Sequence, residues 1–245
     1  MPSAKKSQMS LIILAAIFIV IIAAFIFYIA YYFKQSPIEP LAFEKLSIEN
    51  YINNCVKKTG EEGLKLLGIQ GGSIILADYL QTPNFGISYL YHNGNKVPSI
   101  EKMQNELSSY MNNNLNVCLK DLNDFKAQGW NVEKGVVSTA ASINELDVLF
   151  EVNYPMKIAS KGNTLNFEVF ASKINVRLKY IYNLVTSIVD LNSKIPRSVD
   201  RTALSNYDVD ITVFPYEHSM IYVIDDSKSS ILKQPYRFMF AMKFE

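Results

Sequence analysis

The chain has 245 residues, with 24 Lys and Arg against 23 Asp and Glu, so its formal net charge is +1. This balance argues against a nucleic-acid-binding protein, because binding to phosphates needs a concentrated excess of basic residues. Hydrophobic residues make up 49% and aromatic residues 12% of the chain, which excludes wholesale disorder. The part after position 41 is long enough for one sizeable domain or two small ones.

An apolar run near the N-terminus predicts a transmembrane helix. Residues 9–33 contain no charged side chain, and at about 1.5 Å rise per residue they exceed the roughly 30 Å hydrocarbon core of a bilayer. The apolar region of a secretory signal peptide is shorter, at about 7–15 residues. The run ends in aromatic side chains that suit the membrane–water interface. These interface residues are Tyr28, Tyr31, Tyr32 and Phe33.

The charges that flank this run predict its orientation. Lys5 and Lys6 precede it, whereas only Lys34 follows before the first acidic residues. Basic residues stay preferentially in the cytoplasm. We therefore expect a single-pass protein of the cell membrane, embedded in the bilayer through residues 9–33. Residues 1–8 would be cytoplasmic and the C-terminal domain extracytoplasmic.

The stretch 5–11, Lys-Lys-Ser-Gln-Met-Ser-Leu, resembles the cleavage region of archaeal type IV pilin precursors. The resemblance implies processing after Ser7, which would make Gln8 the new N-terminus. Position 12 departs from the pilin pattern, because Ile12 stands where that family usually has Glu. The segment 34–41 also departs from it, since its two prolines interrupt the helix that pilins continue into the head.

Three further stretches are similar to a group of uncharacterised single-pass membrane proteins of small-genome archaea. They are residues 51–55, residues 68–72 and residues 110–119. This resemblance covers most of the chain but implies no known activity.

We predict a linker over 34–41, followed by an α+β domain over 42–245. Its first part, 42–126, is expected to be mainly helical. Apolar residues recur at helical spacing over 43–67 and again over 100–125, where Pro98-Ser99 marks the start of the helix.

Glycines interrupt the first of these helices. Gly60 and Gly63 are expected to weaken its middle, and Gly68 or Gly71-Gly72 to end it. A phosphate-binding loop is not indicated, because no strand precedes these glycines and no Gly-Lys-Ser/Thr follows them. Short strands are expected over 73–80 and 86–91, and a tight turn at Asn93-Gly94.

The second part, 127–245, is expected to be mainly β with one helix. Alternating residues over 147–154 and 164–170 predict a β-hairpin, with Pro155 ending the first strand or placing it at an edge. One apolar stripe predicts a helix over 176–195. Further strands are expected over 209–214, 220–224 and 236–244. The fold class is therefore α+β, with helices packed on a mainly antiparallel sheet behind the transmembrane helix.

Cys55 and Cys118 each lie on the apolar stripe of a predicted helix. An oxidising exterior would favour a disulfide, which would constrain the unfolded chain by roughly 4 kcal/mol in the entropic model. Two separately buried thiols are the alternative.

No recognisable active site or metal motif emerges. His92 and His218 belong to no nucleophile motif, and no close pair of His and Cys has zinc spacing. Adjacent carboxylates such as Asp225-Asp226 are interpreted as turns, strand edges or solvated faces. We expect no catalytic, cofactor-binding or metal-binding residues.

The leading hypothesis is a membrane-anchored cell-surface protein whose ectodomain binds or scaffolds without catalysis. Its partner would be another envelope protein or a second copy of the chain, and not a nucleic acid. The alternatives are a pilin-like filament subunit processed after Ser7 and a membrane-tethered ectoenzyme. Tyrosines suit an interface, and the candidates for exposure are Tyr79, Tyr89, Tyr91, Tyr207, Tyr216 and Tyr222.

Overall fold

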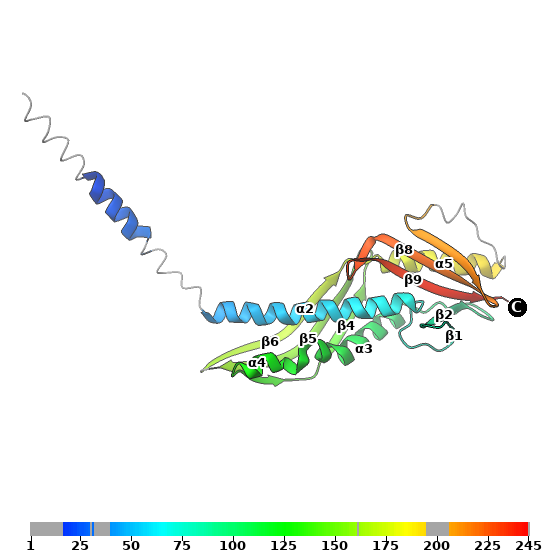
Figure 1. Cartoon of the computed structure of the whole chain (residues 1–245), viewed down its shortest axis with the longest axis horizontal. Helices are drawn as coiled ribbons and strands as arrows, with labels where there is room; N and C mark the ends of the chain where they lie inside the picture. The colour runs from blue at the N-terminus through cyan, green and yellow to red at the C-terminus, as the bar shows by residue number, and fades with distance from the viewer. Residues whose placement is uncertain (1–16, 30, 32–39, 161, 195–205, 245) are drawn as a thin grey trace, which may run out of the picture. The chain divides into compact units, whose positions relative to one another are not determined.

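The computed structural model describes residues 17–29, 31, 40–160, 162–194 and 206–244 (Figure 1). The chain divides into two compact units between Ser47 and Ile48. In the first unit, residues 17–29 form a helix in which every side chain is exposed. Within the described residues, no helix has both the length and the apolar character needed to cross a membrane.

The helices that follow are α2 (Pro40–Ile69), α3 (Ile100–Leu119), α4 (Asn123–Ala127) and α5 (Leu178–Lys194), with a short 3-10 turn, η1 (Lys120–Leu122), after α3. The strands are β1 (Tyr79–Gln81), β2 (Gly86–Tyr91), β3 (Asn131–Lys134), β4 (Ser138–Ile143), β5 (Val148–Ser160), β6 (Asn163–Ile174), β7 (Asp210–Tyr216), β8 (Ser219–Ile231) and β9 (Gln234–Lys243). This arrangement confirms the α+β fold class.

Helix α2 is continuous through the glycines that were expected to weaken it. It begins at Pro40, inside the range predicted as a linker, where proline is tolerated because the first turn needs no amide donor. Its glycines permit close packing: a Cβ on Gly63 would lie only 2.8 Å from the Tyr110 ring of α3, and one on Gly60 only 2.9 Å from Phe150 of β5. The helix ends before Gly71, whose φ of +77° favours glycine.

Helix α3 starts as predicted and ends earlier than predicted. The Ser99 side chain accepts a hydrogen bond from the Lys102 amide at 3.1 Å and caps the first turn. The apolar stripe predicts a helix that reaches position 125, but α3 ends at Leu119 and a different turn begins at Lys120. Three consecutive residues of η1 have φ between +47° and +56°, which forms a left-handed turn. Such a turn costs roughly 1–2 kcal/mol per residue, so the packing around it must hold it in place.

The first of two sheets has β5 at its centre, with β6 along one side and β3 and β4 end to end along the other. The predicted hairpin is confirmed as β5 and β6. The prediction for Pro155 is wrong, because Pro155 lies inside β5, which has partners on both sides. A β-bulge between Asn153 and Met156 accommodates it, and the Pro155 carbonyl accepts the Gly135 amide at 2.8 Å.

Helix α3 covers the free edge of β4. The amide of Ala141 donates to the Ser108 hydroxyl, and the amide of Ile143 donates to the Gln104 side-chain oxygen, both at 3.0 Å. Two helical residues four positions apart therefore satisfy two strand amides two positions apart. Strand β4 offers no open edge at these positions.

The second sheet has the order β1-β2-β9-β8-β7 and is antiparallel except where β2 runs parallel to β9. One face packs on the helices: the Tyr236 hydroxyl donates to the Leu64 carbonyl of α2 at 3.3 Å. The expected strand over 73–80 is largely wrong, since β1 begins only at Tyr79. Strand β8 continues to Ile231, well beyond the predicted end at Ile224.

Candidate functional site

The face of this second sheet away from the helices, here called the outer face, is a ladder of side chains. Residues directly opposite on neighbouring strands share a face, so the pairing register defines the ladder. It is charged at one end and aromatic at the other. The rungs are Asp210–Asp225–Arg237, then Thr212–Val223–Met239, then Phe214–Ile221–Ala241 with Tyr89, then Tyr216–Ser219–Lys243.

Four aromatic residues, here called the aromatic patch, lie over the apolar part of the outer face. They are Phe85, Tyr89, Phe214 and Tyr216. Phe85, Tyr89 and Tyr216 are half-buried on a cluster that includes Ile221 and Met239, and Phe214 is 38% exposed. The Tyr89 hydroxyl contacts the Ser219 hydroxyl at 3.2 Å, which fixes its ring. Rigid aromatic side chains of this kind are enriched at the energetic centre of protein interfaces.

A polar cluster borders the aromatic patch. The His92 ring lies 5.2 Å from the Tyr89 ring, and its Nδ1 lies 3.0 Å from an Asp78 carboxylate oxygen, which Lys96 also contacts. Burial would raise the pKa of Asp78, but hydrogen bonds and charge from Lys96 and His92 outweigh it and hold the pKa below its ordinary value. An apolar centre with an ionic rim is the usual anatomy of a protein-binding surface.

At its other end the outer face borders a cleft of about 560 Å³ between α2, the start of β7 and the β8–β9 turn. Arg237 and Asp225 form a two-pronged ion pair there, at 2.8 and 2.9 Å. Lys65 and Asp210 also line the cleft, and neither has an ion-pair partner among the described residues. The cleft therefore offers one cation and one carboxylate to a polar ligand or partner.

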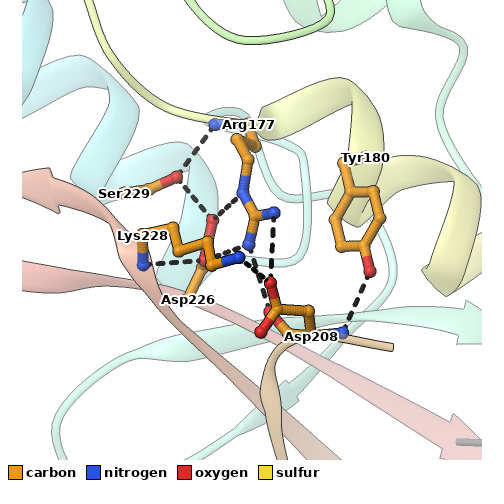
Figure 2. Close-up of polar contacts among 6 residues, drawn as sticks. All are labelled: Arg177, Tyr180, Asp208, Asp226, Lys228 and Ser229. Carbon is orange, nitrogen blue, oxygen red and sulfur yellow. Dashed lines mark hydrogen bonds and ion pairs between the residues drawn. The ribbon is translucent and has the colours of Figure 1, made fainter. Parts of the chain in front are cut away.

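A buried ion pair, here called the clamp, joins the start of α5 to β8 (Figure 2). The Arg177 guanidinium donates to both carboxylate oxygens of Asp226, at 2.6 and 3.1 Å, and Asp226 has no exposed surface. The Ser229 hydroxyl also donates to this carboxylate, as does the Lys228 amide at 3.1 Å. Burial would raise the pKa of Asp226, but these hydrogen bonds outweigh burial and lower it.

The clamp also positions the segment that leads into β7, as Figure 2 shows. Arg177 donates to the Asp208 carbonyl at 3.1 Å, and the Asp208 amide donates to the Tyr180 hydroxyl at 3.1 Å. The Arg177 guanidinium lies 4.7 Å from the centre of the Tyr180 ring, and Lys228 pairs with the Asp208 carboxylate. The start of the edge strand that carries Phe214 and Tyr216 is thus held in place.

The interpretation of Asp225-Asp226 as a turn is wrong. Both residues lie in β8, where a register shift between Asp226 and Ser230 forms a bulge. Sequence reasoning missed the clamp because Arg177 precedes Asp226 by 49 residues. No local spacing signals such a pair.

The tyrosines expected to be exposed have different environments. Tyr89 and Tyr216 belong to the aromatic patch. The expectation for Tyr222 is wrong: it is 1% exposed and stacks on Phe240 with ring centres 4.8 Å apart. The remaining tyrosines lie elsewhere, with Tyr79 exposed on β1, Tyr91 against Phe244 and Tyr207 against Tyr180.

The two cysteines are brought together as predicted. The sulfur atoms of Cys55 on α2 and Cys118 on α3 lie at disulfide distance, 2.12 Å apart, with Cα atoms 5.6 Å apart. The Tyr51 hydroxyl donates to the Leu119 carbonyl at 3.3 Å one helical turn away. Together these contacts hold the end of α3 against α2, beside the left-handed turn.

Several predicted residues concern the N-terminus. Tyr28 and Tyr31 are described and exposed. Others lie outside the described residues: the charged pair Lys5 and Lys6, the processing site Ser7 and Gln8, and the interface residues Tyr32 and Phe33.

Among the described residues, no group of three or more His, Cys, Asp or Glu side chains is arranged to hold a metal ion. No protein-family model, curated protein or solved structure matches the chain.

Proposed function

We propose that this protein is a membrane-anchored binding protein whose folded domain uses its outer face to hold a protein partner. One observation carries the anchoring: residues 17–29 form a helix that exposes apolar side chains all round. A helix without a polar face needs an apolar environment. The uncharged run that contains it, 9–33, is as long as a bilayer requires.

The aromatic patch supports the binding role. It offers Phe and Tyr rings over an apolar base and has an ionic rim, and its residues Phe214 and Tyr216 lie on β7, the strand whose start the clamp holds. Such preorganisation lowers the entropic cost of association.

Anchoring is tested with a charged double substitution. Ile19→Lys with Ile22→Lys puts two cations into the apolar helix, where each costs about 2.5–3.5 kcal/mol of insertion free energy. The full chain should move from carbonate-washed membranes to the soluble fraction. Val117→Lys with Val136→Lys is the matched control, since both residues are highly exposed in the folded domain. Unchanged membrane retention of the first variant would contradict the proposal.

Processing is tested on native membranes by mapping the N-terminal peptide. A peptide that retains Lys5 and Lys6 supports a permanent anchor. A mature N-terminus at Gln8 would instead indicate the pilin-like filament subunit.

Partner binding is tested by placing a photo-crosslinking amino acid at Phe214 in the full chain. An adduct of defined mass should form from this position and not from Glu151, which is exposed on the other sheet. Phe85→Ala with Tyr89→Ala should reduce adduct formation. Equal adducts from both positions would contradict binding through the outer face.

A further inference from the structure

A second cleft, here called the basic cleft, lies between α2 and the turn that joins β8 to β9. It shares Leu232 with the cleft that Arg237 lines. Its volume is about 550 Å³, which lies within the range of small-molecule sites. Figure 1 shows this turn beside α2. The basic cleft is separate from the aromatic patch, because none of the four residues of that patch lines it.

Three lysines give the basic cleft its charge. Lys57 and Lys58 come from α2 and Lys233 from the turn, and all three are exposed. None of the three has an ion-pair partner in the part of the chain that the structure describes. With Glu61 as the carboxylate of the lining, the net charge is +2. A phosphate monoester carries about −1.5 to −2 near neutral pH, so its charge complements that of the cleft.

The turn itself has a costly backbone conformation. Leu232 and Lys233 are the two residues between β8 and β9, and their φ angles are +51° and +65°. A two-residue turn in which both φ angles are positive favours Asn and Gly, because other side chains are strained there. Both side chains nevertheless line the basic cleft. Strained backbone of this kind is concentrated at ligand sites, so the turn supports a binding role.

We propose that the basic cleft binds a phosphorylated saccharide. The three lysines surround its phosphate, since ammonium groups are common partners of phosphate. The side chains of Asn54 and Ser230 and the Glu61 carboxylate supply donors and acceptors for sugar hydroxyls. Leu232, which is 42% exposed, offers an apolar surface to the C–H face of the ring. This site does not depend on the outer face.

The proposal is tested by titrating the full chain, in phosphatidylcholine nanodiscs, with glucose 6-phosphate in a calorimeter. Lys57→Gln with Lys233→Gln should weaken binding about 10- to 100-fold, because hydrogen bonds to charged groups are lost. Lys126→Gln with Lys194→Gln is the matched control, since it removes the same charge from exposed residues outside the cleft. No binding by the wild type, or equal losses in the two variants, would overturn the proposal.

Glu61→Ala separates the contact to the sugar from the contact to the phosphate. It should tighten the binding of inorganic phosphate, because a like charge is removed. Glucose 6-phosphate should lose affinity relative to inorganic phosphate, because an acceptor for its hydroxyls is lost. Parallel changes for both probes would overturn the assignment of a saccharide.

A lipid headgroup is distinguished by adding phosphatidic acid to the nanodiscs. Glucose 6-phosphate should bind as before. Its displacement would assign the basic cleft to lipid phosphate and overturn the proposal. Photo-crosslinking at Phe214 tests the outer face separately, so the two proposals can fail independently.

Discussion

The guanidinium of Arg177 meets the carboxylate of Asp226 side on, where Asp226 has no contact with solvent. Charges are rarely buried so completely, because desolvation of each ion costs several kcal/mol. Hydrogen bonds from Ser229 and from the Lys228 amide complete the carboxylate's shell. The pair ties the start of α5 to the bulge of β8, and its removal has measurable consequences.

Arg177→Met should lower the free energy of unfolding by about 3–5 kcal/mol, because it leaves a buried carboxylate without its partner. Urea unfolding of the full chain in detergent, followed by the fluorescence of Trp130, the single Trp, measures the loss. Arg237→Met is the matched control. Its ion pair with Asp225 is largely exposed, so the loss should be about 0–1 kcal/mol. Equal losses would show that the clamp contributes no more than a surface pair.

The clamp should also make stability depend on pH. The pKa of Asp226 is lower in the folded chain than the ordinary value of about 3.9, so its stabilising contribution is complete above that value. It is lost as the pH falls through the lower, folded pKa. In Arg177→Met, burial without the cation raises the pKa of Asp226 instead. The stability difference between the wild type and this variant should therefore shrink from pH 6 to pH 3. A constant difference would contradict the assignment.

The disulfide predicts a strong response to reduction. Replacing Cys55 and Cys118 together by Ala should cost about 2–5 kcal/mol. Alkylation of the native chain, with and without prior reduction, should show that both thiols are blocked until they are reduced. A chain that labels at both cysteines without reduction would refute the bond.

Gly68→Ala should destabilise the domain by about 1–3 kcal/mol, because the added methyl group would overlap the Arg237 carbonyl oxygen. That oxygen belongs to the backbone and cannot rotate away. Gly135→Ala is the control: its added carbon would meet Pro155 at 3.5 Å, an ordinary contact. Thermal unfolding compares the two. Similar melting temperatures would mean that α2 can move away from β9.

The sequence predicted most of the helices and strands whose caps, turns or apolar patterns are formed by neighbouring residues. The cap at Ser99, the hairpin of β5 and β6 and the stripe of α5 each depend on residues close in the chain. Cys55 and Cys118 could be paired because each occupies an apolar helix face.

The structural features that were not predicted from the sequence depend on contacts between distant segments. The bulge that admits Pro155 requires two strand partners, and the bulge at Asp226 requires Arg177. The packing role of Gly60 and Gly63 depends on side chains of α3 and β5. The aromatic patch unites residues of β2 and β7, which no spacing relates.

The cover that α3 provides for β4 is limited because the rise per residue differs between a helix and a strand. Four helical residues advance about 6.0 Å, whereas two strand residues advance about 6.8 Å. Gln104 and Ser108 each reach an amide of β4. A second step of four residues from Gln104 arrives at Asn112, about 1.6 Å out of phase with Thr139. Asn112 Oδ1 and Thr139 Oγ1 are buried and have no hydrogen-bond partner within the described part of the chain. A straight helix can thus shield only a short strand, and β4, at six residues, is close to the greatest length that α3 can protect.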